Sequence, residues 1–94
     1  MANENFDNLR KKIDDIDSRL LNLLNERAQT VIDLGKIKRA AGLKLYDPDR
    51  EQAIFARLTK DNRGPLAGDA VKRLFERIID ESRRLERTEV YDKD

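Results

Sequence analysis

Apolar residues recur every three or four positions along the first forty residues of the chain. From Ile13 the apolar stripe continues through Ile16, Leu20, Leu24, Val31 and Leu34. This spacing places all of its members on one face of an α-helix. The pattern predicts a long helix that begins near Asn5 to Asn8 and ends near Ala41, because Gly42 supplies a natural C-terminal stop.

Two positions of this stripe hold permanent cations, Arg27 and Lys38. Burying an unpaired charge costs several kcal/mol, so a core face with two cations needs an anion to meet them. The anion is either a carboxylate side chain or a bound ligand. The stripe therefore marks a candidate site.

A second, shorter helix is predicted after a connector at residues 43–46. Asp47 supplies an N-cap carboxylate, and Pro48 occupies the first helical position, where its missing N–H has no cost. The helix continues through Leu58, and the turn-forming residues 62–65 end it.

The third predicted helix runs from about Leu66 to Thr88. Its inward apolar positions are Val71, Leu74, Phe75, Ile78, Ile79 and Leu85. Ser82 and Glu86 share a face with these residues by the same spacing. Residues 89–94 are predicted to be a polar tail. The expected fold is all-α, with three helices in one domain that spans residues 1–94 and has its core within 6–88.

The first predicted helix is longer than the diameter of a compact domain of 94 residues. It would span roughly 50 Å, whereas a compact chain of this size is about 30 Å across. Apolar residues at both ends, such as Phe6, Leu9 and Ile37, would then lack cover, and exposed apolar surface of that extent is normally covered by a partner. We expect an interlocked homodimer.

Composition excludes several classes of function. The 20 basic and 19 acidic residues are interleaved and give a net charge of +1, which argues against a nucleic-acid partner. Cysteine and histidine are absent, which excludes disulfides, thiol nucleophiles, Ser-His-Asp triads and the usual zinc sites. Neither a membrane-spanning run nor a signal-peptide pattern is visible, so we expect a cytoplasmic protein without a membrane partner.

The inward polar residues form a candidate site with the start of the second helix. They are Arg27, Lys38, Ser82 and Glu86, with Asp47, Arg50 and Glu51. A buried salt-bridge network is the alternative interpretation, Arg50 and Glu51 alone could be an exposed pair, and Ser82 could be a small residue at a helix crossing. The location of all these polar residues on inward faces favours a functional site over a purely structural network. Apolar residues would usually stabilise a small core as well as an ionic network does, so stability alone does not account for them.

Several motifs occur in one order along the chain. They are Leu9-Arg10, Ile13, Ile16-Asp17, Leu23-Leu24-Asn25-Glu26-Arg27, Gly35-Lys36-Ile37-Lys38 and Asp47-Pro48-Asp49-Arg50-Glu51. In this order the chain resembles the all-helical class of chorismate mutases over residues 9–86. The resemblance implies rearrangement of chorismate to prephenate, in the phenylalanine and tyrosine branch of aromatic amino-acid biosynthesis, with no cofactor and no metal. It also implies a dimer in which the long first helices cross.

The resemblance implies that each site takes one arginine, Arg10, from the partner chain. Arg10 and Arg27 would bind the substrate carboxylates, and Lys38 would contact a carboxylate and the ether oxygen. The spacing supports the sharing of Arg10, because 28 helical residues separate it from Lys38, roughly 42 Å. Only a second copy could bring these two residues into one pocket.

The remaining roles come from the same resemblance. Glu51, with the backbone at Asp47, would bind the ring hydroxyl, Arg50 would brace the carboxylates, and Ser82 would add a hydrogen bond. Glu86 stands where many family members place a glutamine against the ether oxygen. Because a glutamate must be protonated to donate, we expect turnover to fall as pH rises. Arg27, Lys38 and Glu86 are the expected catalytic residues.

Two other functions remain open. An isochorismate-pyruvate lyase would have the same fold and cationic pocket, although the segment from Asp47 to Glu51 is more similar to the mutases. A non-catalytic helical dimerisation or regulatory module would tolerate loss of Lys38. The product formed from chorismate separates these possibilities.

Overall fold

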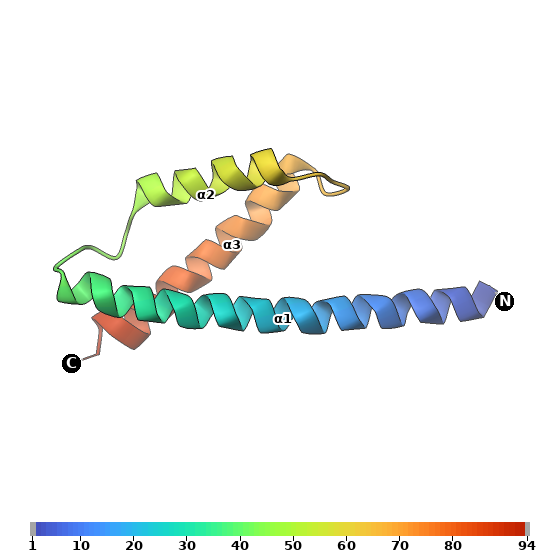
Figure 1. Cartoon of the computed structure of the whole chain (residues 1–94), viewed down its shortest axis with the longest axis horizontal. Coiled ribbons are helices and arrows are strands. Elements are labelled where there is room, and N and C mark those ends of the chain that lie inside the picture. Colours follow the sequence, from blue (N-terminus) through green and yellow to red (C-terminus); the bar gives the residue numbers. More distant parts are fainter. Residues whose placement is uncertain (1, 94) are drawn as a thin grey trace. The chain divides into compact units, whose positions relative to one another are not determined.

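The chain folds into three α-helices and a short π-helical turn (Figure 1). The structure is a computed structural model that describes residues 2–93. Its elements are α1 (Ala2–Ala40), α2 (Pro48–Asp61), α3 (Gly68–Glu86) and η1 (Arg87–Tyr91). Residues 2–93 contain no strand, and none of their helices is long and apolar enough to cross a membrane. The all-α, three-helix prediction is confirmed.

The described chain divides into two compact units, one ending at Thr30 and the other beginning at Val31. The first unit is helical throughout, and its helix is already formed at Ala2, before the predicted start. Neither glycine nor proline interrupts the sequence between Ala2 and Asn8. Its large apolar side chains are all exposed: Phe6, Leu9, Ile13, Ile16, Leu20, Leu21, Leu23 and Leu24.

The second unit begins with the last turns of α1, whose end follows the predicted glycine stop. Gly42 has a φ of 74°, the left-handed conformation that glycine adopts without a steric penalty. The Leu43 N–H donates to the Lys38 carbonyl at 2.9 Å, and the Gly42 N–H donates to the Arg39 carbonyl at 3.0 Å. These two bonds form a Schellman motif, which ends α1 at Ala40 and turns the chain toward α2.

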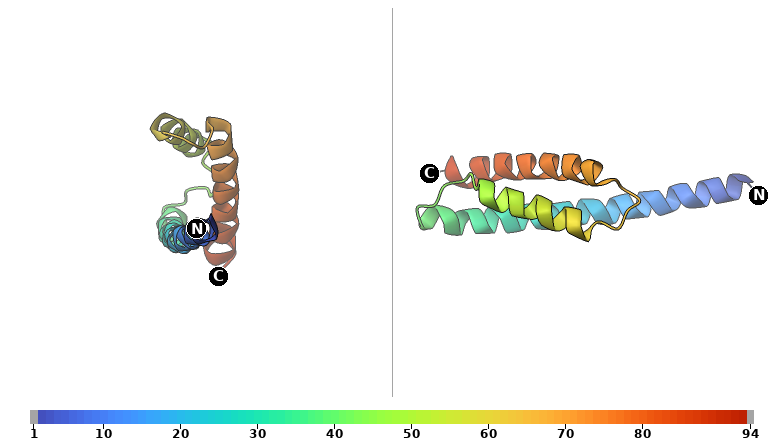
Figure 2. Two further views of the ribbon diagram at one scale, coloured as in Figure 1. Left: turned by 90° about the vertical axis from the view of Figure 1, so that its right-hand side faces the viewer. Right: turned by 90° about the horizontal axis from the view of Figure 1, so that it is seen from above.

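Helix α2 begins where the sequence predicted it. The Asp47 carboxylate accepts a hydrogen bond of 3.1 Å from the Arg50 N–H, and Pro48 follows it as the first helical residue. The helix ends at Asp61, and Gly64, with a φ of 75°, lies in the turn that leads to α3. Figure 2 shows α2 and α3 joined by this turn as a helical hairpin.

The core of the second unit is small. Its buried apolar residues are Ile54 of α2, Val71 and Ile79 of α3, and Val90 of η1. Leu74 was expected to face inward, but 53% of it is exposed. At 100° per residue, Leu74 falls at the edge of the strip that contains Val71 and Ile79, so the prediction for this residue was wrong.

The prediction of a polar tail at residues 89–94 was also wrong. The helical path of α3 continues through η1 to Tyr91, and Val90 is the most buried of the core residues, with 4% exposed. The Arg39 guanidinium donates to the carbonyls of Val90 and Lys93. Val90 lies four residues after Glu86 and eleven after Ile79, so the stripe of the third helix continues to it, but its polar neighbours in the sequence hid this signal. Residues 1 and 94 lie outside the described residues, and the single domain over 1–94 stays a prediction.

Gly35 lies where α1 contacts the Glu86 side chain at the end of α3. It is buried, and a Cβ atom there would lie 2.7 Å from Cγ of Glu86. Real Cβ atoms do not approach so closely, and Glu86 cannot shift without disturbing the bond that its carboxylate makes to Lys38. A glycine is therefore required at this position.

We predict that Gly35→Ala lowers the free energy of unfolding by about 2 kcal/mol, as overpacked sites do, despite the higher helix propensity of alanine. Gly68→Ala is the matched control, since a Cβ at Gly68 meets no atom within 4 Å. Urea unfolding at one protein concentration measures both. Equal stability of the two variants would contradict the proposed contact.

Candidate active site

A nearly buried ion pair joins the end of α1 to the end of α3. Nζ of Lys38 lies 3.1 Å from Oε1 of Glu86, and the two side chains are 16% and 8% exposed. Both belong to the charged residues that the apolar stripes of the predicted first and third helices placed at core positions, as does Arg27. The anion that meets Lys38 in the free chain is thus a carboxylate of the protein itself.

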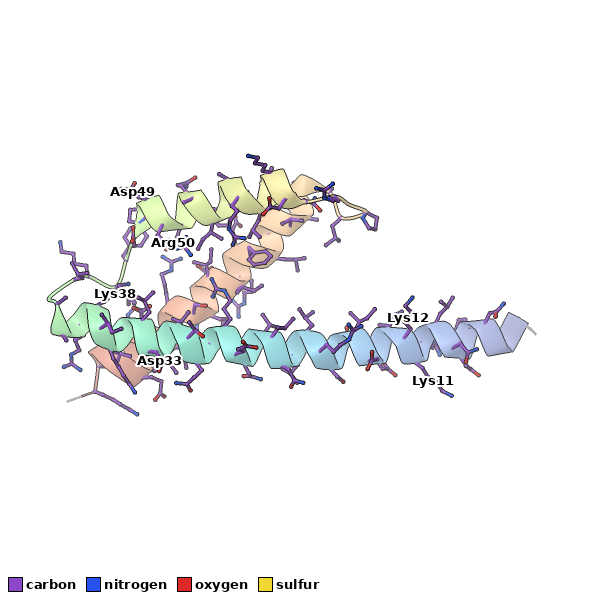
Figure 3. The ribbon with its side chains drawn as sticks, viewed as in Figure 1. Lys11, Lys12, Asp33, Lys38, Asp49 and Arg50 are labelled. Carbon is purple, nitrogen blue, oxygen red and sulfur yellow. The ribbon has the colours of Figure 1, made fainter. Side chains whose placement is uncertain are left out.

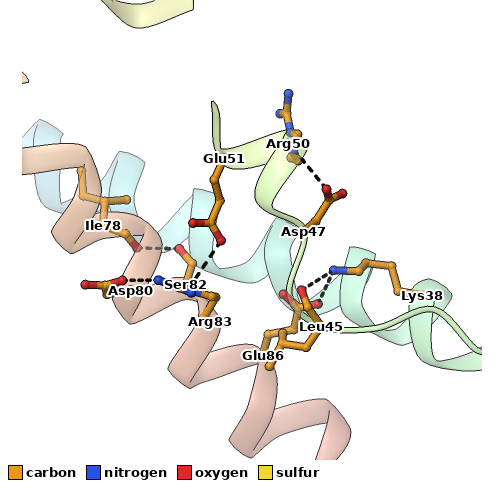
Figure 4. Close-up of polar contacts among 10 residues, drawn as sticks. All are labelled: Lys38, Leu45, Asp47, Arg50, Glu51, Ile78, Asp80, Ser82, Arg83 and Glu86. Atoms are coloured by element: carbon orange, nitrogen blue, oxygen red, sulfur yellow. Dashed lines mark hydrogen bonds and ion pairs between the residues drawn. The ribbon is translucent and has the colours of Figure 1, made fainter. Parts of the chain in front are cut away.

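The Lys38 ammonium group has a second acceptor, the carbonyl oxygen of Leu45, at 3.1 Å (Figure 4). An ammonium group carries three N–H donors. Leu45 and Glu86 therefore use two of them and fix the direction of the group. One donor of an oriented cation remains for a ligand.

A cleft of about 450 Å³ opens beside this ammonium group. It is lined by Leu34, Lys38, Leu43, Lys44, Tyr46, Asp47 and Arg50. Lys38 comes from the end of α1 and Arg50 from the start of α2 (Figure 3). Three cations face one acid, and the Asp47 carboxylate is already bound to the Arg50 N–H. The cleft is therefore suited to an anion that offers several acceptors.

Glu51 and Ser82 do not line this cleft, although the sequence predicted them in the same site. Oε2 of Glu51 lies 3.6 Å from Nε of Arg83, and Oγ of Ser82 donates to the Ile78 carbonyl at 2.8 Å (Figure 4). Arg83 also pairs with Asp80. The structure thus brings Lys38, Asp47, Arg50 and Glu86 together. Glu51 instead pairs with Arg83 of α3, and Ser82 bonds within α3 itself.

Arg10 and Arg27 belong to the first unit. The Arg10 guanidinium lies over the Phe6 ring, 4.1 Å from its centre, and Arg10 is exposed. Arg27 is half-buried. Their participation in the site stays a prediction.

The sequence analysis missed four groups around the site: the Leu45 carbonyl, Lys44, Tyr46 and Arg83. The Arg83 guanidinium lies 5.5 Å from the centre of the Tyr46 ring, while it also pairs with Glu51. The opposite charges of Glu51 and Arg83 are compatible with this ion pair and are visible in the sequence. A backbone carbonyl gives none, because every residue has one.

Comparison with known proteins places these features in a family. The family model described as chorismate mutase type II matches residues 9–87. A bifunctional chorismate mutase/prephenate dehydratase of Neisseria gonorrhoeae is 41% identical over 78 residues, which are 83% of this chain and 21% of that protein. The chain thus spans about a fifth of the length of the curated relatives that it matches first.

Two solved structures are similar over most of the chain. A chorismate mutase from Thermus thermophilus has a TM-score of 0.82 and 38% identity, over 83% of this chain and 89% of that one. A chorismate mutase from Helicobacter pylori, in complex with prephenate, has a TM-score of 0.87 and 27% identity, over 95% of this chain and 97% of that one.

We predict that Lys38→Met lowers the free energy of unfolding by about 3 kcal/mol, because it leaves the Glu86 carboxylate buried without its cation. Adding Glu86→Gln to this variant should restore part of the loss. Urea unfolding of the two single variants and the double variant measures the coupling between the two residues.

Asp69→Asn is the control for this cycle. Asp69 pairs with Arg73 at the surface, where the two side chains are 74% and 67% exposed. The hydrogen bond and charge of Arg73 lower the pKa of the Asp69 carboxyl group. Water screens such a pair, so its loss should leave stability almost unchanged. If Lys38→Met changes the free energy of unfolding as little as Asp69→Asn does, the result would contradict a buried ion pair between Lys38 and Glu86.

Proposed function

The chain belongs to the chorismate mutase type II family, and we propose that it rearranges chorismate to prephenate. The observation that supports this activity most strongly is the oriented Lys38 ammonium group at the edge of a cationic cleft. The substrate is a dicarboxylate, and the cleft offers Lys38, Lys44 and Arg50 to such an anion. A cleft of about 450 Å³ also falls within the range of small-molecule pockets, roughly 300–1,000 Å³.

The reaction takes place within one molecule. A C–O ether bond breaks while a C–C bond forms, and negative charge develops on the ether oxygen. The third N–H of Lys38 would donate to this oxygen, and the positive charge of the ammonium group would attract a carboxylate of the substrate. Because Leu45 and Glu86 already hold the ammonium group, little reorganisation would be needed as the charge develops.

Binding must also hold the substrate in the compact conformer from which the new bond forms. Arg50 would brace its carboxylates, and Arg27, with Arg10 of a second copy, would complete their binding through charge-assisted hydrogen bonds. Glu51, with the backbone at Asp47, would bind the ring hydroxyl, and Ser82 would add a hydrogen bond. Because Glu51 and Ser82 do not line the cleft of the free chain, the substrate would have to extend beyond this cleft toward α3. The Arg83 contact to Glu51 supports such a role, because it holds one carboxylate oxygen and leaves the other to accept a hydrogen bond.

We propose a homodimer with composite sites. In the first unit the large apolar side chains from Phe6 to Leu24 are exposed, and no large side chain among the described residues is fully buried. A second copy, with the same apolar stripe, would cover this surface. Arg10 precedes Lys38 by 28 positions in α1, so sharing between chains is the arrangement that would unite them.

The direct test is the loss of chorismate absorbance on addition of the purified chain, with identification of the product. Prephenate is the expected product, and Lys38→Ala should be nearly inactive. Release of salicylate and pyruvate from isochorismate, with no prephenate from chorismate, would indicate a lyase instead. No turnover of either compound would indicate a non-catalytic module.

Composite sites predict complementation between two inactive variants. Arg10→Ala and Lys38→Ala homodimers should both be nearly inactive, whereas a heterodimer has one pocket with both residues intact. Mixing the variants under subunit exchange should restore up to half of the wild-type activity per heterodimer. Sedimentation of each parent at twice the chain mass is the control. Heterodimers as inactive as their parents would contradict the sharing of Arg10.

The Glu86 side chain gives a further testable prediction. In the structure its carboxylate accepts from Lys38, and a carboxylate has no proton to donate to an ether oxygen. Glu86→Gln keeps an acceptor for Lys38 and adds an N–H donor, so we predict that it retains substantial activity, whereas Glu86→Ala, which offers neither, is nearly inactive. Values of kcat/KM with chorismate measure both variants. A glutamine variant as inactive as the alanine variant would contradict a role of Glu86 at the ether oxygen.

A further inference from the structure

The C-terminal turn η1 is attached to the connection between α1 and α2. Oη of Tyr91 donates to the Leu43 carbonyl at 2.7 Å. Arg39 donates to the carbonyls of Val90 and Lys93, which flank Tyr91 in the sequence, and Val90 is buried. The backbone around Tyr91 is therefore held in place while its hydroxyl group binds the connection.

This connection forms one wall of the cationic cleft. Leu43, Lys44 and Tyr46 line the cleft, and the carbonyl of Leu45 accepts from the Lys38 ammonium group. Side chains from outside the connection thus bind two of its carbonyls. Tyr91 binds Leu43, and Lys38 binds Leu45, two residues further on.

The two contacts are mechanically linked. The connection spans only a few residues between the glycine stop at Gly42 and the N-cap at Asp47. The Leu43 N–H is bound to the Lys38 carbonyl at the end of α1, and Tyr91 binds the Leu43 carbonyl, so together they fix the first peptide unit of the connection. Without the bond from Tyr91 the Leu43 carbonyl can turn away, and the Leu45 carbonyl, two residues further on, is held less firmly. Lys38 would then be directed by Glu86 alone.

We propose that Tyr91 is a positioning residue for the site. It holds residues 43–46 so that the Leu45 carbonyl, together with Glu86, directs the third N–H of Lys38 into the cleft. This role rests on the proposed function, and it gives the C-terminal turn a part in catalysis without contact to the substrate.

The test compares Tyr91→Phe, which removes one oxygen atom and keeps the ring, with Thr88→Val. The hydroxyl group of Thr88 bonds the Leu85 carbonyl within its own helical turn and does not reach the connection. Hydrogen exchange of the amides in residues 43–47 and steady-state kinetics with chorismate are measured on both variants.

Tyr91→Phe should exchange faster in residues 43–47, and its kcat should fall about fivefold, the effect of one lost hydrogen bond. Its KM should change little, because the contact that weakens is the one made to charge in the transition state. Thr88→Val should match the wild type in both measurements. A role of Tyr91 in stability alone would lower the melting temperature and leave kcat at 25 °C unchanged.

Arg39→Ala provides a second variant, since it releases η1 from α1 and leaves the Tyr91 side chain intact. It should reproduce the faster exchange of residues 43–47. Wild-type exchange in both Tyr91→Phe and Arg39→Ala overturns the proposal, and so does faster exchange with an unchanged kcat. An inactive wild-type chain overturns the proposed function instead, and the link between η1 and the connection is then decided by exchange alone.

Discussion

The ion pair between Lys38 and Glu86 is the interaction on which the site depends. It joins the last turn of α1 to the last turn of α3, and it is nearly buried. Gly35, one turn before Lys38, is needed because any larger residue would collide with the Glu86 side chain. A buried pair of this kind contributes little net stability compared with apolar packing. Its value lies in fixing the position of a cation beside the cleft.

The surroundings of Lys38 show how a fixed cation can remain available to a ligand. Two acceptors hold the ammonium group, and neither uses its third donor. The ammonium group is therefore ordered in the free chain, and under the proposed function Lys38 would lose little further side-chain entropy on binding a substrate. Preorganisation of this type stabilises charge that develops in a transition state more than charge already present in the ground state.

Periodic and capping signals in the sequence were sufficient to predict the fold, and they also selected Lys38 and Glu86. Gly42, Asp47 and Pro48 marked helix ends that the structure confirms. The C-terminal turn was not predicted, because the stripe of the third helix was followed only as far as Glu86, although Val90 continues it four residues later among polar neighbours. Nor did the sequence predict the second acceptor of Lys38, since the Leu45 carbonyl is a backbone group whose place is set by the tertiary fold.

The small size of the core explains why folding and function are expected to depend on one another in this chain. Each charged residue on a core face takes the place of an apolar one, and four apolar residues are buried in the part of the chain whose side chains the structure describes. A core of that size cannot offset the conformational entropy of the whole chain. The exposed apolar surface of α1 is a further source of stability once another surface covers it. In the proposed dimer, association would both stabilise the fold and bring Arg10 of one copy to the site of the other.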